Sequence, residues 1–440
     1  MPPSSEQVRK SLRASLWDGV FTSGMVGFTQ DYFIPFLLLL GAPAKYVALL
    51  SSLPNFVAAL VQLKSPDITE HCGSRKKIIN LFVFLQAAVL LPMAFTAFCG
   101  GTHPMAFILM VTVFTAAGAF ATPAWGSLMS DLVPEKKRGE YFGWRNKILG
   151  FVVVGMSFTA GAVLHEIDKI NIFYGFAAIY ACASLFRFVS WYFLTRMYEP
   201  PQQHRKEHYF NIVMFLARIR ESNFAKFVLF VAMLNFSVNL ASPFFPVLML
   251  RELHFNYLLF SVVTVSATLT IYLLMGRWGR LADQVGNLKV LRFTAPIIAM
   301  IPFWWIINRH PAFLIVAQIV SGFAWAGFNL CASNFIYDAV TPEKRTRCIA
   351  YFNVLNGLAL CAGALLGGFL LDRLPPLMGY KILALFAVSG CLRMAVALLM
   401  PPLIKEVRTV QKISSERLFF SMIGMRPLLG IERKTIQYEG

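Results

Sequence analysis

Long apolar stretches, separated by short polar segments, dominate the pattern along this chain. A helix rising 1.5 Å per residue needs about 20 apolar residues to cross the hydrocarbon core of a bilayer. The strands of a membrane barrel would be about half as long and would alternate in polarity. The pattern therefore predicts an all-α membrane protein with twelve transmembrane helices. The predicted spans are residues 16–40, 44–63, 78–98, 104–130, 147–165, 173–195, 223–250, 257–276, 290–308, 312–338, 348–371 and 378–400.

Composition excludes most alternatives to a membrane protein. Of the 440 residues 57% are hydrophobic and 14% charged, whereas a soluble chain carries about 25% charged residues. The seven cysteines form no C-x-x-C pair, all seven histidines lie in loops or at span ends, and no phosphate-binding G-x-x-x-x-G-K-[ST] motif occurs. We therefore expect no cofactor, no metal site, no nucleotide hydrolysis and no enzyme activity.

Basic residues are distributed unevenly between the two sides of the predicted spans. With the N-terminus in the cytoplasm, 31 of the 40 Lys and Arg residues fall in cytoplasmic segments and six on the opposite side. Because Lys and Arg are enriched in cytoplasmic loops, this predicts that both termini are cytoplasmic. It also explains the net charge of +18 without a nucleic-acid partner. The first apolar stretch is longer than a signal peptide's core, so we interpret it as an uncleaved span.

The chain contains an internal repeat. Shifted by about 207 residues, the sequence matches itself across a loop and a whole span, which predicts two pseudo-symmetric six-helix halves with binding at their interface. The predicted domains are an N-terminal bundle (1–195), a cytoplasmic linker with an amphipathic stretch (196–222), a C-terminal bundle (223–402) and a basic cytoplasmic tail (403–440), which either lies on the membrane or is disordered. Matching pairs include Asp131 with Asp338, Arg138 with Arg345, and Asn146 with Asn353.

Several loop motifs carry a resemblance to a known family. The segment GRLADQVGNLK (279–289) resembles the loop signature of the major facilitator superfamily, and PDITEHCGSRKK (66–77) resembles a degraded copy in the other half. The segment DLVPEKKRGEYFG (131–143) is similar to that family's link between spans 4 and 5. The resemblance implies a bacterial-type permease of the inner membrane, a symporter or antiporter that acts as a monomer and couples solute movement to protons or sodium.

The chain departs from two patterns common in proton-driven exporters of that family. Span 4 has no arginine, and span 5 lacks the Gly-Pro signature of antiporters. Export by proton exchange is therefore not indicated by motif.

Asp31 is the acidic residue that we expect deep inside a span, about 21 Å along the helix from Trp17. A central Asp costs ~2.5–3.5 kcal/mol to insert, which marks it as a candidate proton-coupling residue facing a cavity. Its counterpart at an offset of 208 residues is the uncharged Asn239. The alternative is a structural carboxylate that accepts hydrogen bonds near the kink made by Pro35.

Polar and aromatic residues of the expected cavity-lining spans suit an uncharged polar or aromatic solute. Each of them, taken singly, is also compatible with an ordinary contact between helices. The candidate coupling and substrate residues are Gln30, Asp31, Asn55, Asn146, Asn235, Asn239, Trp325, Asn329 and Asn353.

Charged residues recur in the cytoplasmic loops of both halves, where the family resemblance implies a gate that locks the outward-facing state. Arg187 and Arg393, duplicated in spans 6 and 12, are expected to share a structural role such as capping carbonyl groups. The candidate gate residues are Glu70, Arg75, Asp131, Arg138, Asp283, Asp338 and Arg345.

The leading functional hypothesis is that the protein is a secondary active transporter of a small organic solute. Measuring solute flux with and without an ion gradient would test it. The alternative is a protein of the same fold retained as a receptor or as an accessory to another membrane protein. The recurring gate residues favour the transporter.

Overall fold

The computed structural model describes residues 5–133, 138–200, 222–340 and 342–407. Within these ranges the chain is almost entirely helical, with one isolated β-bridge between Leu377 and Tyr380. Eleven of the described helical segments are long and apolar enough to cross a membrane. The prediction of an all-α multi-pass membrane protein is therefore confirmed. The amphipathic part of the linker and the tail beyond residue 407 lie outside the described residues.

The helices fall into two halves along the chain. The N-terminal half contains α1 (Ser5–Thr29), α2 (Phe33–Leu39), α3 (Ala44–Cys72), α4 (Arg75–Phe98), α5 (Pro104–Leu132), α6 (Arg138–Asp168) and α7 (Ile172–Thr195). The C-terminal half contains α9 (Asn223–Asn239), η2 (Ser242–Phe244), α10 (Phe245–Val247), η3 (Leu248–Glu252), α11 (Tyr257–Val285), α12 (Asn287–Ile307), α13 (Pro311–Ala339), α14 (Pro342–Arg373), α15 (Lys381–Leu399) and η4 (Pro401–Leu403).

The first predicted span differs from the structure. The sequence predicts one apolar segment from residue 16 to 40, but α1 begins at Ser5 and ends at Thr29, and α2 continues after a turn. Proline has no N–H to bond the carbonyl four residues earlier, so Pro35 leaves the carbonyl of Asp31 without its helical partner. This accounts for the break in the first span.

The C-terminal half breaks its first span at the equivalent place. There α9 ends at Asn239, four residues before Pro243, and the chain continues through η2, α10 and η3. Both halves therefore interrupt their first span by the same local chemistry.

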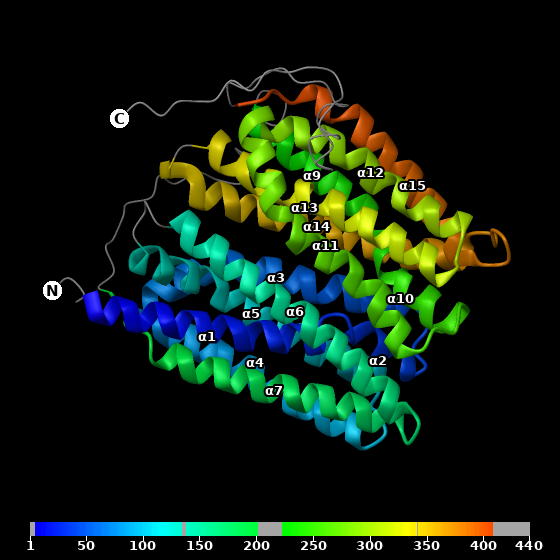
Figure 1. Ribbon diagram of the computed structural model, residues 1–440, viewed down its shortest axis with the longest axis horizontal. Coiled ribbons are helices and arrows are strands. Elements are labelled where there is room, and N and C mark those ends of the chain that lie inside the picture. The colour runs from blue at the N-terminus through cyan, green and yellow to red at the C-terminus, as the bar shows by residue number, and fades with distance from the viewer. Residues whose placement is uncertain (1–4, 134–137, 201–221, 341, 408–440) are drawn as a thin grey trace.

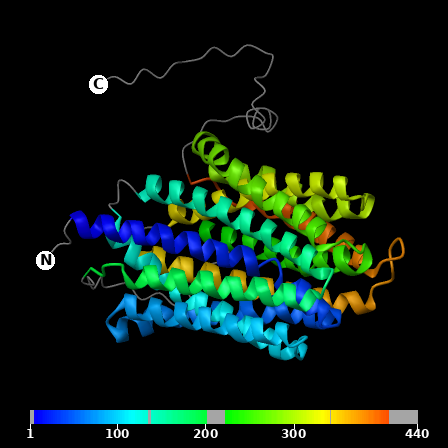
Figure 2. The same ribbon diagram turned by 60° about the horizontal axis from the view of Figure 1, so that its bottom comes forward.

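The two halves lie side by side, as Figure 1 and Figure 2 show. Inside the N-terminal half α4 packs on α5 and α7, and α1 packs on α6 and α7; inside the C-terminal half α13 packs on α11 and α12. Between the halves, α3 packs along α14 and α6 along α11. The repeat therefore sets the interface as well as the interior of each bundle.

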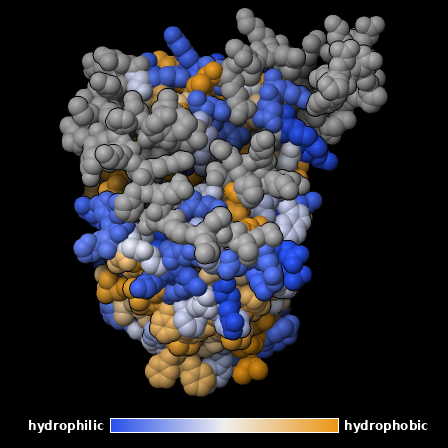
Figure 3. Space-filling model, turned by 90° about the vertical axis from the view of Figure 1, so that its left-hand side faces the viewer, coloured by the Kyte–Doolittle hydropathy of each residue, from blue (hydrophilic) through white to orange (hydrophobic). Residues whose placement is uncertain are grey.

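The bundle has two ends, and one of them carries many hydrophilic side chains (Figure 3). We call the end holding the starts of α1, α4 and α9 the termini end, and the opposite one, where α3, α7 and α11 begin, the distal end. Figure 3 views the termini end and shows hydrophilic side chains gathered there.

Between α3 and α4 the chain turns at Gly73 (φ 64°), and Ser74 caps α4 by accepting a hydrogen bond from the Lys77 N–H at 3.2 Å. This turn places Arg75 and its basic neighbours at the termini end.

Candidate functional site

Asp31 lies in the turn that breaks the first span. The residue is half-buried, and its Oδ2 accepts a hydrogen bond from Ser157 Oγ of α6 at 2.8 Å. The neighbouring Tyr32 is fully buried and donates through its hydroxyl to the Ser157 carbonyl at 2.5 Å. Asp31 is thus held between α1, α2 and α6, with one oxygen bonded to a serine hydroxyl.

The same tyrosine joins the two halves. Tyr32 Oη lies 2.6 Å from Ser261 Oγ of α11, and nearby Arg251 Nη2 donates to the Leu38 carbonyl at 3.0 Å. Both hydrogen bonds connect the N-terminal half to the C-terminal half, and both lie toward the distal end. The N-terminal residues of both contacts, Tyr32 and Leu38, therefore lie close to Asp31 in the sequence.

An amide-lined cavity of about 270 Å³ lies inside the C-terminal half, between α9, α13 and α14. Three predicted site residues, Asn235, Asn329 and Asn353, lie together on its wall. Asn235 Nδ2 donates to Asn356 Oδ1 at 2.7 Å, which fixes the orientation of that pair. The wall offers amide donors and acceptors, as recognition of a polar solute requires. The rest of the polar and aromatic lining includes Ser333, Tyr337, Phe328 and Phe352.

The other predicted cavity residues lie elsewhere. Asn239 Nδ2 donates to the Leu360 carbonyl at 2.6 Å, and Asn55 Nδ2 donates to the Ser51 carbonyl at 2.7 Å. Both amides therefore bond to the backbone of a helix. Gln30 and Asn146 are exposed. Trp325 packs its ring edge-on against Phe328, at 5.6 Å between centroids. The structure thus gathers one subset of the predicted residues into a cavity.

A charged cluster lies inside the N-terminal half, where sequence reasoning placed no site. Asp18 of α1, Arg145 of α6 and Arg187 of α7 are only 5%, 6% and 7% exposed. Asp18 Oδ1 accepts from Ser190 Oγ at 2.7 Å, and Asp18 Oδ2 lies 3.8 Å from Arg145 Nη2. Together with Thr22 and Gln86 these residues border a cavity of about 220 Å³ or bond to its walls. Buried charges of this kind mark functional sites in membrane helices.

Two differences between predicted and observed helix starts explain why the cluster was missed. The apolar pattern places Asp18 at the edge of a span starting near residue 16, but α1 begins at Ser5, which puts Asp18 more than three turns into the helix. The same pattern assigns Arg145 to a cytoplasmic loop, but α6 begins at Arg138 and buries it. The signal in the sequence that could have identified the cluster was the recurrence of small residues, such as Gly19, around these charged residues.

The duplicated arginines differ in their partners. Arg393 donates to the Val238 carbonyl at 3.1 Å and the Ile298 carbonyl at 3.4 Å, so the expected carbonyl-capping role applies to it. Arg187 donates instead to side chains: Nε to Gln86 Oε1 at 2.8 Å, and Nη1 to Thr22 Oγ1 at 2.5 Å and Ser190 Oγ at 3.0 Å. A shared structural role therefore does not describe Arg187.

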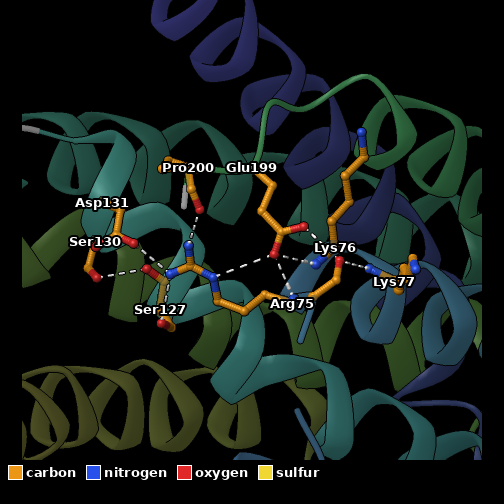
Figure 4. A network of polar contacts seen from close by, with 9 residues as sticks. Arg75, Lys76, Lys77, Ser127, Ser130, Asp131, Glu199 and Pro200 are labelled. Carbon is orange, nitrogen blue, oxygen red and sulfur yellow. Dashed lines mark hydrogen bonds and ion pairs between the residues drawn. The ribbon is translucent and has the colours of Figure 1, made fainter. Parts of the chain in front are cut away.

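The predicted gate residues of the N-terminal half form a tight network at the termini end (Figure 4). Arg75 is fully buried, and its Nη1 lies 2.6 Å from Asp131 Oδ2. It also donates to Ser127 Oγ at 3.1 Å and to the Pro200 carbonyl at 3.0 Å. Glu199, which sequence reasoning missed, accepts from the Arg75 backbone N–H at 2.6 Å.

The C-terminal half repeats part of this network. Asp338 Oδ2 accepts from Asn287 Nδ2 at 2.7 Å, and Glu406 accepts from the Leu288 backbone N–H at 2.7 Å. Glu406 follows Glu199 by 207 residues, the repeat offset, so each half ties the segment after its last span to the first turn of its third span. The offset itself could have identified both glutamates. Each of these contacts joins residues of the same half.

The remaining gate candidates lie near the same end. Glu70 and Asp283 are exposed there. Arg138 begins α6 and Arg345 lies near the start of α14, but their side chains lie outside those described. No group of three or more His, Cys, Asp or Glu suited to a metal ion occurs among the described residues.

Two halves of repeated topology, each with a broken first span and polar residues inside its bundle, define a membrane transporter built by duplication. The profile of the Major Facilitator Superfamily matches residues 16–238 and again 225–431. The chain therefore belongs to the Major Facilitator Superfamily, and its class is that of a secondary transporter.

Solved structures share the fold at low sequence identity. The nucleoside transporter NupG is 12% identical with a TM-score of 0.68, covering 90% of this chain and 98% of that one. A D-xylose-proton symporter is 11% identical with a TM-score of 0.69, covering 92% and 99%. A POT family transporter in complex with 5-aminolevulinic acid is 10% identical with a TM-score of 0.69, covering 90% and 96%. No curated protein matches the chain by sequence. These likenesses establish the fold.

Proposed function

We propose that this protein is a proton-coupled secondary transporter that moves a small organic solute across a bacterial inner membrane by alternating access. The observation that carries the proposal is the position of Asp31. Its carboxylate accepts a hydrogen bond from the Ser157 hydroxyl, and the backbone carbonyl of the same residue accepts one from Tyr32, whose hydroxyl contacts Ser261 of the other half. A change of proton occupancy at Asp31 therefore acts on the contact that closes the distal end.

The proposal assigns the termini end to the cytoplasm, in line with the distribution of basic residues. The hydrogen bonds of Tyr32 and Arg251 between the halves then lie on the extracellular side. The ion pair of Arg75 with Asp131 stays within one half, as expected when the cytoplasmic gate is open. In this proposal the structure represents an inward-facing state.

The amide-lined cavity supports a solute rich in hydrogen-bonding groups. Four asparagines and a serine on its wall match hydroxyl, amide or carbonyl groups, and two phenylalanines match an apolar ring or chain. Proteins that share the fold include a nucleoside transporter and a D-xylose-proton symporter, and both nucleosides and D-xylose are uncharged polar solutes. A first screen would therefore use nucleosides, sugars and small amino acids.

The test is solute-driven proton flux into proteoliposomes that contain a trapped pH dye. We expect Asp31→Asn to abolish solute-driven acidification and gradient-driven accumulation, because the amide keeps the size and hydrogen bonding but cannot titrate. Asn239 already shows that an amide is accepted at the equivalent position. Asp67→Asn, at an exposed carboxylate that lies 3.9 Å from Lys64, is the matched control and should transport normally.

Wild-type accumulation by Asp31→Asn protein would show that coupling lies elsewhere. Absence of flux for every solute class in wild-type protein, with gradient and protein orientation verified, would favour a receptor or accessory role instead.

A further inference from the structure

The charged cluster inside the N-terminal half has an unbalanced charge. Two guanidinium groups, Arg145 and Arg187, face a single carboxylate, Asp18, and all three are more than nine-tenths buried. The other residues that line the cavity are uncharged. A buried charge without a partner costs several kcal/mol, which in membrane spans is generally relieved by a counterion. The cavity therefore carries one positive charge that no described residue neutralises.

The geometry leaves hydrogen-bond donors free for a ligand. Arg145 uses Nε and Nη2 to bond the Ser15 carbonyl, at 3.3 and 3.0 Å, and Arg187 uses Nε and Nη1. Nη1 of Arg145 and Nη2 of Arg187 donate to no described residue. Since both side chains line the same cavity, these two groups can converge on one small anion.

The walls indicate what the anion is attached to. The Arg145 guanidinium lies 4.8 Å from the centre of the Trp125 ring, which also lines the cavity. The remaining wall is largely aliphatic, with Val83, Ala121 and Leu149. A volume of about 220 Å³ has room for one small organic group. A carboxylate on a short apolar or aromatic stem matches this combination.

The other half provides an internal control. At the repeat offsets Asp18 corresponds to Lys226 and Arg145 to Phe352, and the duplicated Arg393 has carbonyl partners. The paired arginines are thus specific to one half, whereas a requirement of the fold would be expected in both.

We propose that the cavity between α1, α4, α5, α6 and α7 binds the carboxylate of an organic monoanion, with Arg145 and Arg187 as its direct ligands and Asp18 as the competing internal carboxylate. The single excess charge favours a monoanion over a dianion. The identification of this monoanion with the transported solute rests on the proposed transport function, but its binding does not.

Binding is tested without any gradient, so that a failure here is distinguishable from a failure of transport. Purified protein in a neutral detergent is unfolded thermally with benzoate, acetate or the neutral isostere benzamide, at constant ionic strength. We expect benzoate to raise the melting temperature in proportion to the logarithm of its concentration above Kd, and benzamide to leave it unchanged. Equal effects of benzoate and benzamide, or no effect of either carboxylate, would overturn the proposal.

Variants assign the ligands. Arg145→Gln and Arg187→Gln should each weaken benzoate at least tenfold, whereas Lys147→Gln, an exposed cation on the same helix, and Arg393→Gln should leave its Kd unchanged. Asp18→Asn should tighten benzoate binding, because the competing carboxylate is removed; a purely structural cluster would not show this change of sign. Wild-type affinity in either cavity arginine variant would contradict the assignment.

A second measurement covers the case in which an arginine variant fails to fold. Thr122 is exposed and lines the cavity, so Thr122→Cys can be introduced after the seven native cysteines are replaced by serine. Benzoate should slow maleimide labelling of this cysteine by at least threefold, and benzamide should not. Labelling rates that are the same with both compounds would contradict binding at this cavity.

Discussion

Gly161 of α6 provides a sharp test of alternating access because it lies where the two halves touch. A Cβ at this position would overlap Oγ and Cβ of Ser261 in α11 and would lie 3.1 Å from the Tyr257 carbonyl oxygen. Ser261 is buried, and its hydroxyl contacts Tyr32, so it cannot turn away without loss of that contact. Gly161→Ala should therefore oppose closure of the distal end.

The magnitude follows from the overlap. An extra methyl group in a well-packed interface costs about 1–3 kcal/mol, which changes the population ratio of closed to open distal states by about 5- to 150-fold. The higher helix propensity of alanine, about 1 kcal/mol, acts on both states and cancels. Gly155 lies on the same helix with no atom within 4 Å of its would-be Cβ. Gly155→Ala is therefore the matched control.

The assay is a spin-label distance between the distal loops of the two halves. Labels at Ile170 and His310, which are both exposed, report opening of the distal end without disturbing the interface. We expect Gly161→Ala to shift the distance distribution toward longer values, while Gly155→Ala keeps the wild-type distribution. Identical distributions for the two variants would refute the claim that this contact closes the distal end.

Three further predictions address the structural arginine Arg393, the membrane topology and the cytoplasmic gate. Arg393→Gln should lower the stability by about 2 kcal/mol, because charged hydrogen bonds to two backbone carbonyls are lost; an unchanged melting temperature in detergent would contradict this. An impermeant maleimide applied to intact cells should label Cys99 but not Cys72 in single-cysteine variants, both thiols being exposed at opposite ends; the reverse pattern would invert the topology. Asp283→Asn should reduce transport while membrane insertion stays normal and should favour inward-facing states; unchanged accessibility of cysteines placed in the cavities would exclude Asp283 from the gate.

The positions of the spans could be predicted because apolar length is a one-dimensional signal. A helix in lipid must satisfy its own backbone hydrogen bonds, so a long apolar stretch permits few other structures. Helix ends were less predictable: α6 begins at Arg138, well before the expected span at residue 147, because polar residues extend a helix beyond the apolar stretch. The break before Pro35 was recognisable as a kink, and Pro243 matches Pro35 at an offset of 208 residues, but residues 223–250 were still predicted as one unbroken span.

Side-chain partners could be predicted only where the repeat or the family resemblance restricted them. Arg75 and Asp131 were assigned to one gate, and they form an ion pair. Arg145 was counted as a loop cation, since its burial depends on which face of α6 packs against its neighbours. Asparagines 235, 329 and 353 were expected in a cavity, but so were Asn55 and Asn239, and composition could not show which amides bond to the backbone.

Comparison of the halves separates the groups that keep the scaffold from those that give it direction. Some residues common to both halves serve structure: Glu199 and Glu406 hold equivalent backbone N–H groups, and Pro35 and Pro243 make equivalent breaks. The charged cavity occurs in one half, and the amide cavity occurs in the other. A symmetric scaffold allows the halves to rock between two similar packings, and asymmetric chemistry makes those packings differ in free energy for a solute and a proton. Substitutions at these four residues should therefore impair stability and transport together, whereas substitutions in the cluster or the cavity should alter affinity or coupling in a protein that still folds.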